Sequence, residues 1–315
     1  MNVRLKTFVV PAVLVVSLVI VQTRAALAAG MVIDHRCVDI TRVPLRAILA
    51  AKTNLHIGYG HTSHGSQLAD GMRGLVDFAN GGGKGLALPQ NVFAVSQDDQ
   101  SPGSLHLHES DGLDGDVGYY PDWVNYTRSF LGDPDPVTGR GQANPSYNVI
   151  IWSWCGQVSS KYASGTLILE YLAPMAQLEL DYPGVRFVYM TGHLDHWDDA
   201  NNKAANAAIR AYCKTNGKIL YDFADIESWD PDGTYYEYAG DDCSYYDASG
   251  TYLGNWAQNW QGAHTENVDW YNCGSAHSEP LNANQKAYAT WWLWARLAGW
   301  PGPVPLAAVH SLLMQ

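Results

Sequence analysis

A serine flanked by two histidines stands in the stretch Gly60-His61-Thr62-Ser63-His64-Gly65. Residues 55–59 before it are apolar and suit a buried strand, and residues 66–80 after it carry apolar side chains at helical spacing. The stretch is therefore predicted to be a strand-to-helix turn, where the helix start supplies unpaired N–H groups and a partial positive charge. Ser63 can serve as a nucleophile there, although Ser, Thr and His near a helix start are also common capping residues.

The amino-terminal residues 1–28 have the pattern of a secretory signal peptide. Arg4 and Lys6 precede an apolar run over residues 8–20, and Ala26-Leu27-Ala28 forms a small-residue cleavage site. The run is shorter than the ~20 residues that span a bilayer, which favours cleavage over a membrane anchor. We therefore expect a secreted or periplasmic protein with no membrane association after cleavage.

The net charge of the protein limits the kinds of molecule that it is expected to bind. The net charge is −12, and loss of the leader would remove three basic residues and no acidic ones. A surface that acidic argues against nucleic acid and anionic lipid as partners.

The order of elements predicts the fold. Residues 29–300 are expected to form one domain, followed by a tail over residues 301–315. Helical patterns at 166–180, 199–214 and 283–297 alternate with short apolar segments at 55–59, 91–95, 148–152, 185–190 and 218–222. Such alternation implies right-handed crossovers and a parallel sheet covered on both faces. The predicted fold is a three-layer α/β/α sandwich with a mostly parallel five-stranded sheet and long loop insertions near 96–147 and 229–272.

Five cysteines allow at most two disulfides. Export permits disulfides, and Cys243 and Cys273 flank the same irregular region, so we expect this pair first. Cys155 follows a buried-looking strand and is expected to be a packed free thiol. The sequence has no Cys-x-x-Cys motif, so no structural zinc site is expected.

A second histidine-bearing segment, residues 276–282, precedes the last predicted helix. Together with the serine segment it resembles the SGNH (GDSL-like) hydrolase superfamily, which consists mostly of esterases and acylhydrolases. That family has a flavodoxin-like sheet, with its serine after the first strand and its histidine before the last helix. A variant of the serine block, Gly-His-x-Ser-x-Gly, matches residues 60–65 position by position. The resemblance implies Ser63 as nucleophile, His277 as general base and acyl transfer from an ester.

This sequence matches only some of the residues that form the oxyanion hole in the family. Where the family carries an asparagine, this chain has Gly156-Gln157, and the resemblance implies Gln157 as the side-chain donor. Gly118 or Gly115 is the nearest counterpart of the oxyanion-hole glycine. In the implied mechanism, these groups and the Ser63 N–H would hold the negative oxygen of the tetrahedral intermediate.

The acid of the family triad has no direct counterpart. The family usually carries an aspartate three residues before its histidine, and that position is Gly274 here. Two possibilities remain open. Either another carboxylate such as Asp269 or Glu279 orients His277, or a backbone carbonyl does so in a Ser-His dyad.

Further histidines are expected at the same end of the sheet. His61, His64 and His193 are predicted to line the site and to contact substrate. The spacing of His193, Asp195 and His196 matches no recognised ligand signature, so no metal or other cofactor is expected. Metal-assisted glycan hydrolysis centred on those three residues is kept as an alternative.

The predicted export and the acidic surface favour neutral polymers as substrates. The twelve tryptophans and nineteen tyrosines favour them as well, because aromatic faces stack on sugar rings. The predicted function is therefore a secreted serine esterase that deacylates a carbohydrate or cleaves another small ester. A noncatalytic polysaccharide-binding protein on a hydrolase scaffold is the second hypothesis. It is supported by the missing aspartate and by Trp256, Trp260 and Trp270 in the late insertion.

Overall fold

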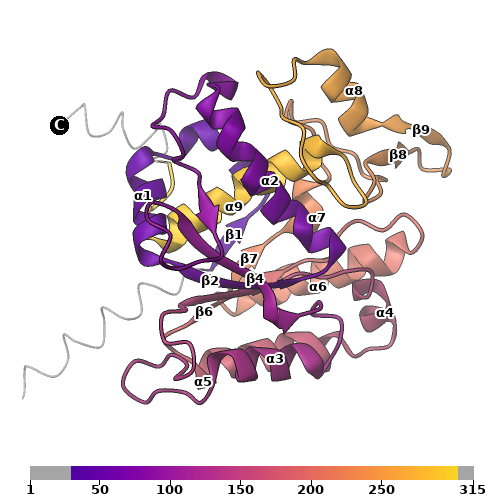
Figure 1. Cartoon of the computed structure of the whole chain (residues 1–315). Coiled ribbons are helices and arrows are strands. Elements are labelled where there is room, and N and C mark those ends of the chain that lie inside the picture. Colours follow the sequence, from indigo (N-terminus) through magenta and orange to yellow (C-terminus); the bar gives the residue numbers. More distant parts are fainter. Residues whose placement is uncertain (1–29, 304–315) are drawn as a thin grey trace, which may run out of the picture.

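The computed structural model describes residues 30–303 and contains a seven-stranded sheet between two layers of helices (Figure 1). The predicted leader and nearly all of the predicted tail lie outside these residues. All six pairings within this sheet are parallel, in the order β1-β7-β6-β5-β2-β4-β3. The strands are β1 Met31–Ile33, β2 His56–His61, β3 Val95–Ser96, β4 Leu105–Asp114, β5 Val149–Trp152, β6 Arg186–Met190 and β7 Ile219–Tyr221.

The predicted α/β class and parallel sheet are confirmed, but the prediction of five strands is wrong. Strand β4 and helix α3, Asp122–Leu131, lie within the region predicted to be a long loop insertion. In β4 the polar residues His106, His108 and Glu109 interrupt the apolar pattern, although His106 and Glu109 are buried in the sheet. The predicted strand at 91–95 is mostly a turn, because β3 begins only at Val95.

Alternating side chains of each strand face the two helical layers. In β5, Val149 and Ile151 pack in one core cluster, whereas Ile150 and Trp152 pack in the other. The first face is covered by α1 Leu45–Asn54, α2 Ser63–Asn80 and α9 Pro280–Leu297. The second face is covered by α3, α4 Val158–Ala163, α5 Ala173–Asp181 and α6 Asp199–Thr215. The ribbon view shows α2 and α9 on one side of the sheet and α3 and α5 on the other (Figure 1).

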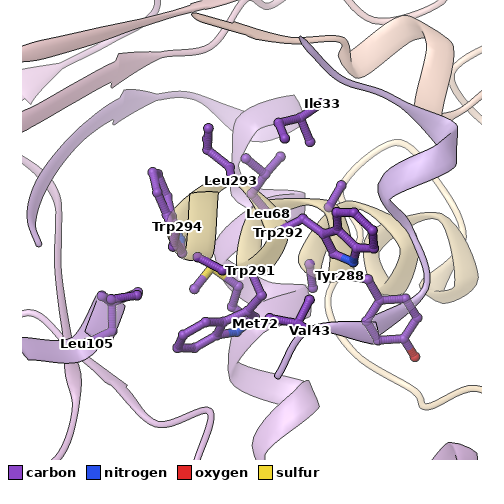
Figure 2. Close-up of a cluster of buried hydrophobic side chains, with 14 of the residues drawn as sticks. Ile33, Val43, Leu68, Met72, Leu105, Tyr288, Trp291, Trp292, Leu293 and Trp294 are labelled. Carbon is purple, nitrogen blue, oxygen red and sulfur yellow. The ribbon is translucent and has the colours of Figure 1, made fainter. Parts of the chain in front are cut away.

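Helix α9 is buried on nearly all sides and packs directly against α2. Figure 2 shows Trp291, Trp292 and Trp294 of α9 among Leu68 and Met72 of α2. A Cβ at Gly71 would stand 2.3 Å from the carbonyl oxygen of Ala283, so glycine permits this close approach. The packing fixes the first turns of α9 against the middle of α2, so the loop that carries His277 is held beside the helix that begins with Ser63.

The short elements connect this framework. Single turns are η2 His35–Cys37, η3 Ile40–Arg42, η4 Gly83–Gly85 and α7 Phe223–Ile226. The predicted helix at 166–180 begins as a π-helix, η5 Ile168–Leu172, and continues as α5. Within residues 30–303, none of the helices has the length and apolar character needed to cross a bilayer.

The late insertion over residues 229–272 has regular structure and forms a small core together with Leu194, Ala224 and Leu281 of the surrounding domain. It contains an antiparallel ribbon, β8 Ser244–Tyr246 and β9 Tyr252–Asn255, followed by α8 Trp256–Ala263. Trp256 and Trp260 are buried in that core, and Trp270 packs against it. Trp256 and Trp260 therefore stabilise the insertion from inside, whereas Trp270 is only partly buried.

The structure contains no bond between Cys243 and Cys273, and their pairing stays a prediction. All five cysteines are free. The sulfur of Cys243 lies 3.3 Å from the Ser278 hydroxyl, and that of Cys273 lies 3.9 Å from the Pro280 carbonyl oxygen. Cys155 is likewise unbonded and half-buried, and its sulfur lies 3.3 Å from His64 Nδ1.

Candidate functional site

The candidate site lies at the carboxyl ends of the central strands. Ser63 follows β2, Gln157 follows β5 and His193 follows β6. His277 reaches the same edge from the loop before α9. This edge is where parallel α/β sheets bind ligands, since loops and helix starts converge there.

Ser63 is the first residue of α2, as the strand-to-helix turn predicted. The Ser66 N–H donates to the Thr62 carbonyl at 3.0 Å and closes the first turn. A Cβ at Gly65 would stand 2.3 Å from the Ser153 hydroxyl and 2.4 Å from the His61 Cβ, so only glycine lets the helix approach the strand ends. The Tyr59 hydroxyl donates to the Gly65 carbonyl at 2.8 Å and holds this approach.

The structure brings Ser63 and His277 together across 214 positions of sequence, with 2.8 Å between the serine Oγ and the imidazole Nε2. His277 is a non-glycine residue with φ of +64°. Such a backbone costs on the order of 1–3 kcal/mol and persists where surrounding contacts impose it. The pair has the geometry of a hydroxyl nucleophile and its general base.

Buried polar contacts impose the position of the His277 loop. The Gln67 side-chain amide, one turn beyond Ser63 in α2, donates to the Ala276 carbonyl at 2.5 Å. Lys286 of α9 donates to the carboxylate of Glu227 at 2.7 Å and also to the carbonyl oxygen of the Gln67 side chain. The other oxygen of Glu227 accepts from the Leu194 N–H at 2.5 Å. One fully buried ion pair thus connects α2, α9 and the loop after β6.

Asp116, which sequence reasoning missed, organises the predicted oxyanion residues. Its carboxylate accepts from the Gly118 N–H at 2.8 Å, from the Gln157 amide at 3.3 Å and from the Thr62 hydroxyl at 3.3 Å. Burial raises the pKa of Asp116, and these three donors oppose that shift. Gly118 and Gln157 therefore bind Asp116 in this structure instead of standing free for an oxyanion, whereas Gly156 borders open space.

Three imidazoles form a stack beside the nucleophile. The ring of His64 lies 3.7 Å from that of His193 and 4.4 Å from that of His277, with interplanar angles of 4° and 15°. His64 Nε2 lies 3.0 Å from Asp241 Oδ2, and His64 Nδ1 lies 3.3 Å from the Cys155 sulfur. Burial lowers the pKa of His64 to about 4 despite the hydrogen bond to Asp241, so the ring is neutral at pH 7.

The remaining predicted residues stand apart from the pair. His61 is directed to Glu109, with 3.5 Å between Nε2 and a carboxylate oxygen. Asp269 accepts from the Thr265 N–H at 2.9 Å, and Glu279 accepts from the Gln258 amide at 2.7 Å. Among the described residues, neither carboxylate binds His277, so neither is the missing acid in this structure.

Asp241, from the late insertion, is the carboxylate that comes closest to the role of the aspartate in the family triad. It lines the same pocket as His277. Burial opposes ionisation of Asp241, but the hydrogen bond from His64 and the neighbouring imidazoles outweigh it and lower the pKa of Asp241. A Gly-Asp-Asp turn within an aromatic insertion was the sequence signal that could have singled it out.

The pocket beside His277 has a volume of about 320 Å³. Asp241 and Asp242 form its polar wall, and His196 stacks on Tyr246 at 3.7 Å. Trp197 lies at the rim and is 94% exposed. An acidic wall with open aromatic faces suits a ligand that has hydroxyl donors and flat apolar faces.

Two larger hollows lie elsewhere. One of about 550 Å³ is bordered by Asp39 and Tyr288, and one of about 770 Å³ is bordered by Arg186 and Lys218. Neither hollow is lined by Ser63 or His277. The pocket beside His277 therefore remains the candidate site, although its volume is smaller.

The structure does not gather His193, Asp195 and His196, the metal ligands considered from the sequence, into one cluster. Asp195 accepts from the Trp197 and Asp198 N–H groups, and His196 stacks on Tyr246. Among residues 30–303, two groups of side chains have the spacing of metal ligands. Neither group contains Asp195 or His196.

Comparisons with protein-family models, with curated proteins and with solved structures find no match for this chain. Functional inference therefore depends on the residues around Ser63.

Proposed function

We propose that this protein is a serine hydrolase that cleaves an ester by acyl transfer, with an acylated carbohydrate as substrate. The observation that carries the proposal is the 2.8 Å contact between Ser63 Oγ and His277 Nε2 at the start of a helix. A hydroxyl is a poor nucleophile at neutral pH unless a base within hydrogen-bond reach accepts its proton.

The proposed reaction proceeds in two steps. Ser63 Oγ attacks the acyl carbonyl carbon while its proton moves to His277 Nε2, which then returns the proton to the departing alcohol. Water then gives a proton to His277 and attacks the acyl carbon, and His277 returns that proton to Ser63 Oγ as the bond to the serine breaks and the acid is released. The Ser63 N–H at the start of α2 and the positive end of that helix favour the oxyanion of each tetrahedral intermediate.

The pocket residues support a carbohydrate as the alcohol component. Carboxylates of Asp241 and Asp242 can accept hydrogen bonds from sugar hydroxyls, and the exposed face of Trp197 can stack on a pyranose ring. A secreted location remains a proposal that rests on the leader pattern of residues 1–28.

The proposal is tested by incubating the purified protein with 4-nitrophenyl acetate and with an acetylated xylan. We expect nitrophenol and acetate to be released above the rate of buffer alone. Affinity electrophoresis on the same xylan measures binding in parallel. Binding without hydrolysis of either substrate would reject the esterase and favour the noncatalytic polysaccharide-binding protein.

A further inference from the structure

A cluster of metal-ligating side chains lies beside Ser63 and is not used in the acyl-transfer steps. One ring nitrogen each of His64 and His193 and one carboxylate oxygen of Asp241 lie within 4.8 Å of one another. The three residues come from the start of α2, the loop after β6 and the late insertion. The fold thus brings together ligands that no local spacing in the sequence reveals.

His193 has the contacts of a histidine that is oriented for a ligand. Its Nδ1 lies 2.5 Å from the Leu194 carbonyl oxygen, so Nδ1 carries the proton and Nε2 keeps a free lone pair. His193 is 93% buried, and its Nε2 has no hydrogen-bond partner among the described residues. A buried acceptor without a partner is costly, on the order of 1–3 kcal/mol. Metal-ligating histidines typically donate their other N–H to a carbonyl or carboxylate in this way.

The loop that carries His193 is fixed by buried contacts. The Asn202 side chain donates to the His193 carbonyl at 2.8 Å, and the Asn206 side chain accepts from the Gly192 N–H at 2.8 Å. Glu227 holds the Leu194 N–H at 2.5 Å. These contacts set the ring in place from both sides.

The donor set suits a transition metal. Two imidazoles and one carboxylate, with a position left for water or substrate, are a recurrent set of ligands in catalytic zinc sites. With bonds of roughly 2.0–2.1 Å, tetrahedral ligands stand about 3.3 Å apart. The donor atoms lie within 4.8 Å of one another, so binding one ion requires them to move together by up to about 1.5 Å. The His64 and His193 rings are parallel, so one ion shared by both requires them to tilt toward each other.

We propose that His64, His193 and Asp241 bind one divalent transition-metal ion of the zinc class next to the Ser63–His277 pair. The site differs from the metal alternative drawn from the sequence, because His64 and Asp241 take the places of Asp195 and His196. Binding of the ion does not depend on the esterase function, and its measurement needs no substrate.

The test uses untagged, chelator-treated protein that is titrated with Zn²⁺ by isothermal calorimetry, with bound zinc counted by elemental mass spectrometry. Wild type is expected to bind one equivalent. His193→Gln and Asp241→Asn are each expected to weaken binding at least about 100-fold. Asp241 is part-exposed, so Asp241→Asn keeps the test valid if His193→Gln does not fold.

Two variants serve as controls. His196→Gln changes a histidine of the same loop that stacks on Tyr246, and Ser63→Ala removes the proposed nucleophile. Both are expected to bind zinc as wild type does, so loss of the esterase and loss of the metal site are distinguishable. Failure of wild type to bind a stoichiometric ion, or unchanged binding in both Asp241→Asn and His193→Gln, would overturn the proposal.

Discussion

Replacement of Ser63 by alanine is expected to lower kcat for ester hydrolysis by roughly 10⁴-fold or more while the fold is retained. Alanine has no Oγ, which is the serine atom that lies 2.8 Å from His277 Nε2. Because Ser63 is half-buried at the start of α2 and its hydroxyl contacts only His277 among the described residues, the loss of one oxygen should leave packing intact. Steady-state kinetics on 4-nitrophenyl acetate, with circular dichroism on the same sample, measure both effects.

Further variants distinguish a catalytic role of Ser63 from a general disturbance of the structure. Residues that act as one unit have non-additive effects, so His277→Ala and the double variant should lose about as much as Ser63→Ala alone. Ser164→Ala, at an exposed serine after α4, should keep wild-type kinetics. Activity of Ser63→Ala equal to that of Ser164→Ala would contradict the assignment of the nucleophile.

Replacement of Glu227 by glutamine is expected to reduce the free energy of unfolding by about 3–5 kcal/mol. Lys286 is 0% exposed and Glu227 is 1% exposed, so the change leaves a buried ammonium without its counter-charge. Burial lowers the pKa of Lys286 and raises the pKa of Glu227, and each charge opposes the shift of the other. Urea denaturation of wild type and variant measures the difference.

The part-exposed pair Asp199–Lys203, at 2.8 Å in α6, is the matched control. Its variant Asp199→Asn should cost at most about 1 kcal/mol, because solvent already screens that pair. The double variant Glu227→Leu with Lys286→Met should be closer to wild type than Glu227→Gln, since it removes both charges together. Equal losses at the buried and part-exposed pairs would contradict the role given to the buried network.

The sequence was sufficient for the parts of the fold that local pattern encodes. Strands β5, β6 and β7 and helices α2, α6 and α9 were predicted within a few residues, since apolar spacing and caps mark them. Strand β4 was missed because His106 and Glu109, which are buried by pairing in the sheet, look like loop residues in the sequence. Burial of polar residues is a tertiary property, and no local window shows it.

The same limit applies to the site. Ser63 and His277 were predicted because each stands next to a recognisable element boundary. Asp241 was missed because it lies in an insertion whose path is set by the small core around Trp256. The contacts of His64, with His193 on one face and Asp241 at its edge, depend on three separate loops meeting.

The most direct measurement is covalent labelling of the wild-type protein with a fluorophosphonate, followed by peptide mass spectrometry. Such a reagent phosphonylates a serine whose proton a neighbouring base accepts, and fluoride leaves. The result predicted here is a single adduct on Ser63, formed far more slowly in His277→Ala. Absence of an adduct, or labelling of other serines at the same rate as Ser63, would contradict an activated serine at this site.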